Sequence, residues 1–392
     1  MDGPRQARQT GYHMMRAAVA PTRDIEHMLA PLQQAYWVDV VRLRDALPDL
    51  DPHVLLHAGP AYAADAVVPV PVMQAAAQAL VFEGAAADVP AALQLLASGT
   101  YRFEPAQNHG VVTPLAQVVS SRMPMAVVRL GHTIRYAPLL EAGVPSLRFG
   151  SQDPSCVVAL HAISRLGLGI LAPCLRSASL AVAPWLRDAL QQGDECHSRT
   201  GVANQSMIEA LVTTFPALGD ELLSTLSSNP NFVLTLIMAA CACVLETQDG
   251  DIKAAGGNGM EFGVRLAGEN HWRKVPATAP TGCFIPGHEN TVVLGAIGDS
   301  AVIDFCGLGG QALSLAPALL SLWQGLLPAD AADRARYVLN ERTGLVCAAS
   351  IAQSGVSPIV HLAMVDAHGV QGLAGRGFYA PSVSLFSSLL QG

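Results

Sequence analysis

Short apolar runs and Ala-rich stretches alternate over residues 51–150. The run His53–His57, which stands before Gly59–Pro60, predicts a buried strand that ends in a turn. Apolar spacing predicts a helix over 72–83, and Asp88 predicts the N-cap of the next helix. Further strands are predicted at 101–103, 111–112, 118–119 and 125–130.

The pattern changes at Asp153, after which strand signals almost disappear as far as Gln248. Proline and glycine separate successive stretches with helical spacing, which indicates a helical domain or insertion. These stretches are 154–166, 172–181, 184–191, 195–214, 216–226 and 232–247.

Glycine and β-branched residues become frequent again from Asp249 onward. They predict strands at 260–266, 271–275 and 359–365, with helices at 311–324 and 329–342. A Gly-rich tail covers 369–377. At the other end of the chain, 24–30 and 32–47 have helical spacing.

Together these patterns predict a mixed α/β or α+β fold, with two α/β domains that flank a small all-helical domain. We expect an N-terminal helical extension over 1–50, an α/β domain over 51–150, a helical domain over 151–248 and a Gly-rich α/β domain over 249–392.

Composition adds an expectation about assembly. The hydrophobic fraction is 51% and the charged fraction only 14%, which suggests large buried interfaces and therefore a homo-oligomer or a complex with other subunits. The formal net charge of −8 argues against a nucleic-acid surface. The apolar run Phe232–Leu245 is shorter than the roughly 20 residues that span a bilayer, so we expect a core helix and no membrane segment.

The eight cysteines have no Cys-x-x-Cys spacing, so no zinc or iron–sulfur site is expected, and no metal is assigned. The N-terminus lacks the apolar core of a signal peptide. These features predict a cytoplasmic, reducing environment. No hydrolase nucleophile elbow, P-loop, dinucleotide fingerprint or His-Glu-x-x-His motif is present, and no cofactor is predicted.

The densest candidate for chemistry is the stretch Ile297–Gly310, in which Asp299 and Ser300 precede a β-branched run and the turn Gly307–Gly310. Backbone N–H groups of glycine turns can cradle an anion, and a helix starting at residue 311 would add its positive end. Tight turns between buried elements are the simpler alternative.

Three further segments carry polar groups. Glu83 lies at the end of an Ala-rich helix, where the helix dipole opposes it. In Gly193–Arg199, Glu195 and Arg199 are four residues apart and can form a simple ion pair on one helix face. Gly256–Gly259 is interpreted as a sharp turn that presents Asn258.

Several pieces of the chain, in order and spacing, resemble the YlbE-like (AllG) family between about Val54 and Pro381. They are Leu55–Pro60, Phe82–Gly84, Ser121–Met125, Gly193–His197, Asn258–Gly259 with Phe262–Arg265, Gly298–Ala301 with Gly307–Gly310, and the Gly-rich tail that ends at Ala380–Pro381. The resemblance implies two α/β parts around a small helical domain. It also implies a subunit of a catabolic oxamate carbamoyltransferase, which converts oxalurate and phosphate to oxamate and carbamoyl phosphate.

The chain departs from the family's pattern in three polar loops. Gln107–Asn108, with His109 after it, stands where the family has a His-His pair and an Asn. The segment His361–Asp366 stands where the family tends to have both an Asn-Thr-Gly and a His, and Gly257 stands where the family usually has an Arg. Because binding residues tend to lie in such loops, we expect a divergent member with another carbonyl or carbamoyl substrate.

The first hypothesis is therefore an enzyme, or an enzyme subunit, that acts at a C–N bond of a small carbamoyl, ureido or amide compound. Backbone N–H groups near Gly309, Gly310 and Gly259 would bind phosphate, carbamoyl phosphate or a developing oxyanion. The remaining candidates are side chains: Asn258, Ser300 and Asn108 as hydrogen-bonding groups, Glu83, Glu195 or Asp299 as general base with His197 or His109 as alternatives, Arg199 or Arg265 as carboxylate ligands, and Cys196 as a less favoured nucleophile.

Two alternatives stay open at this point. Altered polar loops and low charge also suit a non-catalytic scaffold subunit of a multi-subunit complex. The other alternative is that the chain is a relative recruited to another small-molecule pathway, for example as a sensor.

Overall fold

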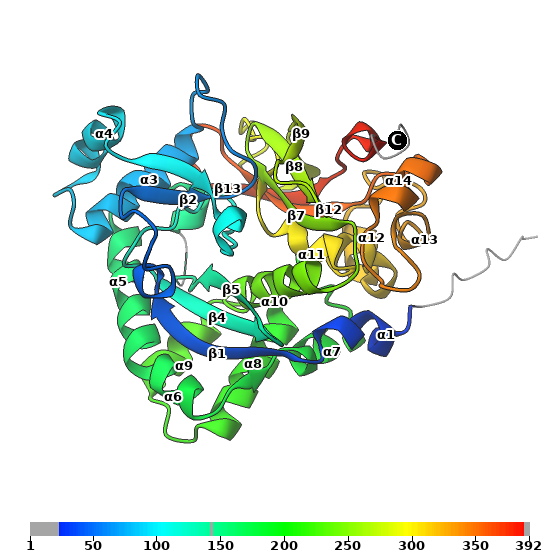
Figure 1. Ribbon diagram of the computed structural model, residues 1–392, viewed down its shortest axis with the longest axis horizontal. Coiled ribbons are helices and arrows are strands. Elements are labelled where there is room, and N and C mark those ends of the chain that lie inside the picture. The colour runs from blue at the N-terminus through cyan, green and yellow to red at the C-terminus, as the bar shows by residue number, and fades with distance from the viewer. Residues whose placement is uncertain (1–22, 142, 144, 388–392) are drawn as a thin grey trace, which may run out of the picture.

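The structure, a computed structural model, describes residues 23–141, 143 and 145–387. Helices and small, mainly antiparallel sheets share one body (Figure 1), so the predicted mixture of helices and strands is confirmed. Most of the expected N-terminal extension, residues 1–22, lies outside the described residues.

One four-stranded antiparallel sheet has the order β5-β4-β1-β6. Its strands are β1 (Ala35–Arg42), β4 (Pro124–Leu130), β5 (Thr133–Pro138) and the short β6 (Leu180–Ala181). The helix expected over 32–47 is therefore wrong, because its centre is the strand β1. Tyr, Trp and Val side chains in this segment favour a pleated, half-buried strand, and this tendency outweighs the helical spacing of its apolar residues.

Two helices from the middle of the chain, α6 (Ala172–Ser177) and α10 (Leu234–Thr247), pack on this sheet. Helix α10 also contacts β7 (Ile252–Asn258) and α11 (Ala301–Phe305), and so lies between the two halves of the protein (Figure 1). The expected helix over 195–214 starts only at Gly201. The helices are α5 (Ser155–Leu166), α6 (Ala172–Ser177), α7 (Ala183–Gln191), α8 (Gly201–Thr214), α9 (Asp220–Ser227) and α10 (Leu234–Thr247).

Helices α5 and α6 are joined by the π-helical segment η4 (Gly167–Leu171) into one run, Ser155–Ser177. By length and composition alone this run could cross a membrane. In the structure it packs against α3 (Val70–Glu83) and β1, and it places Leu160, Ile163 and Leu171 in the core. One face of the run thus belongs to the core of this fold.

Residues 51–112 form a smaller unit around the parallel pair β2 (Val54–His57) and β3 (Arg102–Pro105). Helix α3 (Val70–Glu83) packs on α4 (Val89–Ala97). The side chain of Asp88 accepts a hydrogen bond from the backbone N–H of Ala91, which confirms the predicted N-cap.

The C-terminal part contains two further sheets. One has the order β11-β7-β8-β9, with β7 (Ile252–Asn258), β8 (Glu261–Leu266), β9 (Arg273–Pro276) and β11 (Ile297–Gly298). The other has the order β10-β13-β12, with β10 (Thr281–Phe284), β12 (Val360–Val365) and β13 (Leu373–Tyr379). Residues Gly256, Gly257 and Asn258 thus belong to a strand, and Gly259 and Met260 turn the chain.

Helix α11 (Ala301–Phe305) lies inside the Gly-rich stretch, where a β-branched run stood in the sequence. The helix expected over 311–324 is wrong for its first half: two 3₁₀ turns precede α12 (Pro317–Leu322). Pro317 disfavours helical backbone at Ala316, which separates these pieces.

The helix expected over 329–342 shrinks to α13 (Ala335–Val338). The side chain of Asn340 accepts hydrogen bonds from the N–H groups of Arg342 and Thr343 and so builds a turn there. The other elements are α1 (Ile25–Leu29), α2 (Leu43–Ala46), α14 (Ala348–Ser354) and the 3₁₀ turns η1 (Ala30–Leu32), η2 (Ala106–His109), η3 (Leu147–Phe149), η5 (Gly309–Gln311), η6 (Leu313–Leu315) and η7 (Val383–Leu385).

One continuous set of buried apolar side chains runs from Met28 to Phe386, and a small second set surrounds Trp323. Helices of 155–247 therefore share their core with the sheet of β1, β4 and β5. The division of the chain at 50, 150 and 248 into separate domains stays a prediction.

Candidate functional site

A cavity of about 160 Å³ lies where α10, α11, β12 and β13 meet the loops that precede β4 and α8. Its lining comes from segments that are far apart in the sequence. The polar lining residues are Arg148, His197, Ser198, Asn231, Ser300 and Arg376.

His197 and Asp304 form the first of two buried pairs beside this cavity. The Nδ1 atom of His197 lies 2.8 Å from Oδ2 of Asp304. The other carboxylate oxygen, Oδ1, accepts hydrogen bonds from the N–H groups of Gly310, at 2.7 Å, and His361, at 3.2 Å. A side chain at Gly309, whose φ is +50°, would overlap with the Asp304 carboxylate. The Gly-rich turn therefore wraps around Asp304 and fixes its direction.

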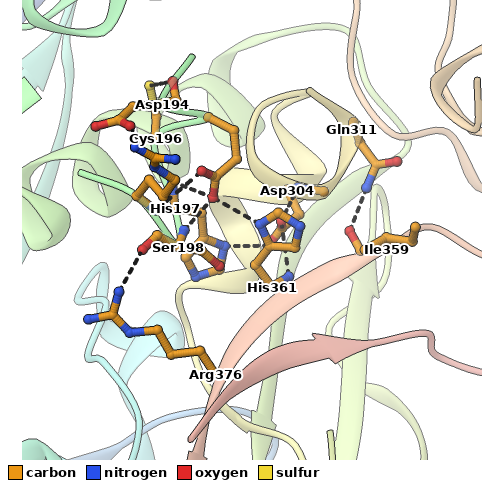
Figure 2. Close-up of polar contacts among 12 residues, drawn as sticks. Asp194, Cys196, His197, Ser198, Asp304, Gln311, Ile359, His361 and Arg376 are labelled. Carbon is orange, nitrogen blue, oxygen red and sulfur yellow. Dashed lines mark hydrogen bonds and ion pairs between the residues drawn. The ribbon is translucent and has the colours of Figure 1, made fainter. Parts of the chain in front are cut away.

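Glu195 and His361 form the second pair, directly beside the first. The Nδ1 atom of His361 lies 2.9 Å from Oε1 of Glu195, and both side chains are fully buried. Figure 2 shows His197 and His361 next to each other, with ring centres 6.0 Å apart. Nε2 of His361 has no hydrogen-bond partner among the described residues, whereas His197 lines the cavity.

The charges of the two pairs are coupled. Burial alone would lower the pKa of His197, but the charge and hydrogen bond of Asp304, together with the charge of Glu195, raise it overall. Burial alone would raise the pKa of Glu195, but the hydrogen bond and charge of His361 and the charge of His197 lower it. The arrangement thus favours an ionised Glu195 and a His197 that holds its proton readily.

The backbone explains why Glu195 is not in a helix. Its carboxylate accepts hydrogen bonds from the N–H groups of His197, Ser198 and Arg199, so these amides do not donate to helical carbonyl groups. Cys196 has φ +71°, an uncommon conformation for a residue other than glycine. This tight loop places His197 at the cavity.

Two arginines supply positive charge to the cavity. Arg148 is only 6% exposed, and its Nη1 has no hydrogen-bond partner within the described parts of the chain. Burial lowers the pKa of Arg148, the charge of Glu141 opposes this, and the nearby charge of Arg376 lowers the pKa further. Arg376 is exposed and donates to the carbonyl of Ser198 at 3.5 Å (Figure 2). The Arg148 guanidinium also lies over the Phe149 ring, 4.9 Å from its centre. A buried charged nitrogen without a hydrogen-bond partner is costly, so the cavity is suited to an anion.

Of the two residues predicted in Gly298–Ala301, only Ser300 lines the cavity. Asp299 is fully buried, and its hydrogen bonds link separate segments of the chain. Its Oδ1 accepts from the N–H of Gly59 at 2.9 Å and from Nε2 of Gln107 at 2.6 Å, and its Oδ2 accepts from the N–H of Thr113 at 3.0 Å. Burial raises the pKa of Asp299 to about 7 despite these bonds.

The predicted anion nest at Gly307–Gly310 is occupied by the protein itself. The N–H of Gly309 donates to the carbonyl of Glu195 at 2.9 Å, and that of Gly310 donates to Asp304. The anion that this turn holds is therefore the Asp304 carboxylate, and these two amides are not available to phosphate.

Asn258 and Gly259 have structural bonds. Nδ2 of Asn258 donates to the carbonyl of Pro60, and its Oδ1 accepts from the N–H groups of Met260 and Glu261. The N–H of Gly259 donates to the carbonyl of Ala296. Both residues hold the β7–β8 turn and do not line the cavity.

The other sequence candidates do not line this cavity either. Glu83 accepts from Ser120 and from the N–H of Arg122 beside a different surface pocket. Asn108 accepts from Trp272, and His109 contacts Glu104. The contacts of the remaining three are as follows: Arg199 pairs with Asp194 instead of Glu195, Arg265 lines a small separate pocket, and Cys196 is buried with its pKa raised by burial and by the charges of Glu195 and Asp194, so it is an unreactive thiol.

Sequence reasoning missed Asp304, His361, Arg148 and Arg376 as functional residues. Asp304 stands inside the Gly-rich stretch and His361 inside an altered loop, so both were in view without an assigned role. Arg148 and Arg376 carried one weak signal: each is a single charge in an apolar or Gly-rich segment.

Within the part of the chain that the structure describes, no group of three or more His, Cys, Asp or Glu side chains could hold a metal ion. The described side chains offer hydrogen bonds, two guanidinium groups and an imidazole.

Comparison with known proteins shows the family of the chain. The family described as oxamate carbamoyltransferase subunit AllG matches residues 101–300, which is about half of the chain. The chain belongs to the AllG family. The match spans His197, Arg148 and Ser300, whereas Asp304, His361 and Arg376 follow it.

Two relatives of this chain come from Escherichia coli K12. The oxamate carbamoyltransferase subunit AllG is 28% identical over 305 residues, which cover 72% of this chain and 71% of that protein. The uncharacterized protein YahG is 27% identical over 384 residues, covering 89% of this chain and 80% of that protein.

A solved structure has the same fold. The crystal structure of a conserved protein of unknown function from Enterococcus faecalis V583 superposes with a TM-score of 0.82 at 25% identity, covering 93% of this chain and 96% of that one. The AllG family resemblance seen in the sequence motifs is confirmed by the family match and by the similarity to the E. coli AllG subunit.

Proposed function

We propose that this chain is an enzyme subunit that binds a small carboxylate-bearing carbamoyl, ureido or amide compound in the cavity and acts at its C–N bond. One observation carries the proposal: the buried guanidinium of Arg148, with no partner for Nη1 within the described chain, lines the same cavity as the carboxylate-oriented imidazole of His197. A cation and an acid–base group in one small cavity suit an anionic substrate that exchanges a proton.

Each polar group then has a role. Arg148 and Arg376 bind the substrate carboxylate, and Ser300 and Asn231 offer hydrogen bonds to its carbonyl or amide. Asp304 bonds Nδ1 of His197, which leaves Nε2 for the substrate. When an acceptor oxygen attacks the carbamoyl carbon, the C–N bond breaks and His197 donates a proton to the departing nitrogen.

Assembly and location belong to the same proposal. The name of the relative AllG describes a subunit, and we propose that this chain also works in a complex, or as a homo-oligomer, with phosphate or carbamoyl phosphate as the second reactant. All eight cysteines are free thiols, which agrees with a cytoplasmic location.

The test is binding and turnover of oxamate, oxalurate and other ureido acids by the purified chain, with and without phosphate, and by the complex that it forms in its own cells. We expect binding of at least one of these acids, loss of binding in Arg148→Leu, and loss of turnover with retained binding in His197→Gln. Absence of binding by all of these acids would overturn the proposal.

A scaffold role is the second candidate, because the nest at Gly309–Gly310 is filled by the protein's own Asp304 and Glu195. Retained turnover of the complex with His197→Gln would favour that role and exclude His197 as the proton donor.

A further inference from the structure

The cavity has a second chemical character besides its charge. Leucine and phenylalanine side chains from five separate segments line it: Leu115, Phe149, Leu234, Leu362 and Leu373. Leu115, Phe149 and Leu362 are 8%, 5% and 4% exposed, so the surrounding protein fixes them in place. A small, fully polar acid such as oxamate has no group that would use this apolar wall.

Leu115, one of these apolar lining residues, has an unfavourable backbone conformation. Its φ is +50°, in the left-handed region that leucine avoids and glycine or asparagine tolerates. The chain turns there against Gly298, where a Cβ would lie only 2.9 Å from the Leu115 nitrogen. A residue held in strained backbone often has a functional reason, and here its side chain lines the cavity.

The size of the cavity permits a substituent beside the charged group. Its volume of about 160 Å³ is an order of magnitude larger than the roughly 10–15 Å³ that one water needs. A carboxylate at Arg148 and a carbamoyl group near His197 would leave the leucines without contacts unless the ligand also carries an alkyl group.

We propose that the cavity selects a carbamoyl or ureido acid with an aliphatic side chain, such as an N-carbamoyl amino acid of the valine or leucine type, over smaller all-polar acids. Leu115, Leu362 and Leu373 determine this preference. The inference rests on the proposed function, because it takes the anionic end of the ligand to lie at Arg148.

A series of ligands with a constant polar end tests the preference. The full chain is titrated calorimetrically with N-carbamoylglycine, N-carbamoylalanine, N-carbamoylvaline and N-carbamoylleucine, and with oxamate. Burial of one methylene is worth about 0.8 kcal/mol, which corresponds to about fourfold in Kd. We expect Kd to fall along the series, by tenfold or more from the glycine to the leucine compound.

Variants at the wall separate apolar contact from folding. Leu115→Asn keeps the branched shape of the side chain and suits the left-handed backbone, but it removes the apolar surface. We expect the preference for N-carbamoylleucine over N-carbamoylglycine, measured as the ratio of their Kd values, to shrink by about tenfold. Leu373→Asn, at a half-buried position, should act in the same direction, and Leu326→Asn, exposed outside the cavity, should leave the whole series unchanged.

The outcomes are distinct. If N-carbamoylglycine or oxamate binds as tightly as N-carbamoylleucine, the aliphatic preference is overturned and the proposed function stands. If Leu115→Asn and Leu373→Asn leave the ratio unchanged, the assignment of the wall is overturned. If none of the compounds binds, the proposed function itself fails.

Discussion

The imidazole of His197 lies 2.8 Å from the carboxylate of Asp304, although 107 residues separate the two in the chain. A tight loop after α7 presents the histidine, and the Gly-rich turn after α11 holds the carboxylate through the N–H of Gly310. Both partners are buried beside a cavity that Arg148 also lines, with no hydrogen-bond partner for its Nη1 among the described residues. The pair therefore fixes the direction of one ring and leaves its other nitrogen for a ligand.

Replacing the carboxylate tests whether this direction matters. In Asp304→Asn the acceptor for Gly310 persists, but the orienting charge is lost, and the pKa of His197 should fall. We expect turnover of the substrate found by titration to drop by about 10²–10⁴-fold with a smaller change in KM, measured as kcat and KM across pH 5–9. Asp45→Asn, at an exposed position, serves as the matched control. Unchanged kcat in folded Asp304→Asn would exclude the proposed role of the pair.

Arg148 allows a prediction about both stability and affinity. Its Nη1 lacks a hydrogen-bond partner within the described residues, but the guanidinium lies over the Phe149 ring and its charge interacts with that of the fully buried Glu141. Because removal of this cation leaves a buried carboxylate without the opposing charge, we expect Arg148→Leu to lower the free energy of unfolding by about 3 kcal/mol and to weaken binding of the anionic ligand by 100-fold or more. Urea unfolding and calorimetry measure the two effects.

The exposed Arg129 provides the control for that experiment. Arg129→Leu should leave both quantities nearly unchanged. Loss of stability in Arg148→Leu together with unchanged ligand affinity would show that Arg148 is a structural cation.

Local patterns predicted much of the fold but little of the pairing between distant segments. Helix α4 with its Asp88 cap and strand β12 follow directly from residue spacing. β1 was misjudged because its apolar residues also fit a helical period, and the sheet partner that decides the matter, β4, lies about 90 residues later.

Only part of the candidate site was predicted, because its contacts also join segments that are far apart in the sequence. His197 and Ser300 were identified and do line the cavity. Glu195 was paired with Arg199 because four residues separate them, whereas its carboxylate binds three nearby N–H groups and His361, 166 residues away. Helical spacing does not show that the Glu195 carboxylate accepts hydrogen bonds from the backbone of its own loop. It also does not show a distant partner such as His361 on β12.

Asp299 predicts a specific pH dependence. Burial raises its pKa from 3.8 to about 7 in the folded protein, so the native state holds this proton more tightly than the unfolded chain. Its contribution to stability is complete below about pH 4 and is lost as the pH rises through about 7, up to about 4 kcal/mol for a shift of this size.

Asp299→Asn removes that dependence. The variant should be less stable at all pH values, because its amide group would face the N–H of Thr113 or Gly59. Its unfolding free energy should nevertheless fall less between pH 5 and 8 than that of the natural chain, as measured by urea unfolding at each pH. Equal slopes in the two proteins would show that Asp299 keeps an ordinary pKa.

Gly257 tests the close strand contact that supports the site. It pairs with Gly298 in β11, immediately before Asp299 and α11, and a Cβ at 257 would overlap with the backbone of Ala296. The added Cβ would overlap with backbone atoms, which cannot rotate away as a side chain can, so β11 would have to shift. We expect Gly257→Ala to lower the unfolding free energy by about 3 kcal/mol or more and to weaken ligand binding, since Asp304 follows β11 on α11. Gly219→Ala, at φ −76° with no heavy atom near its added Cβ, should change stability by less than about 1 kcal/mol; an equally small effect at Gly257 would mean that β7 and β11 are not held this closely.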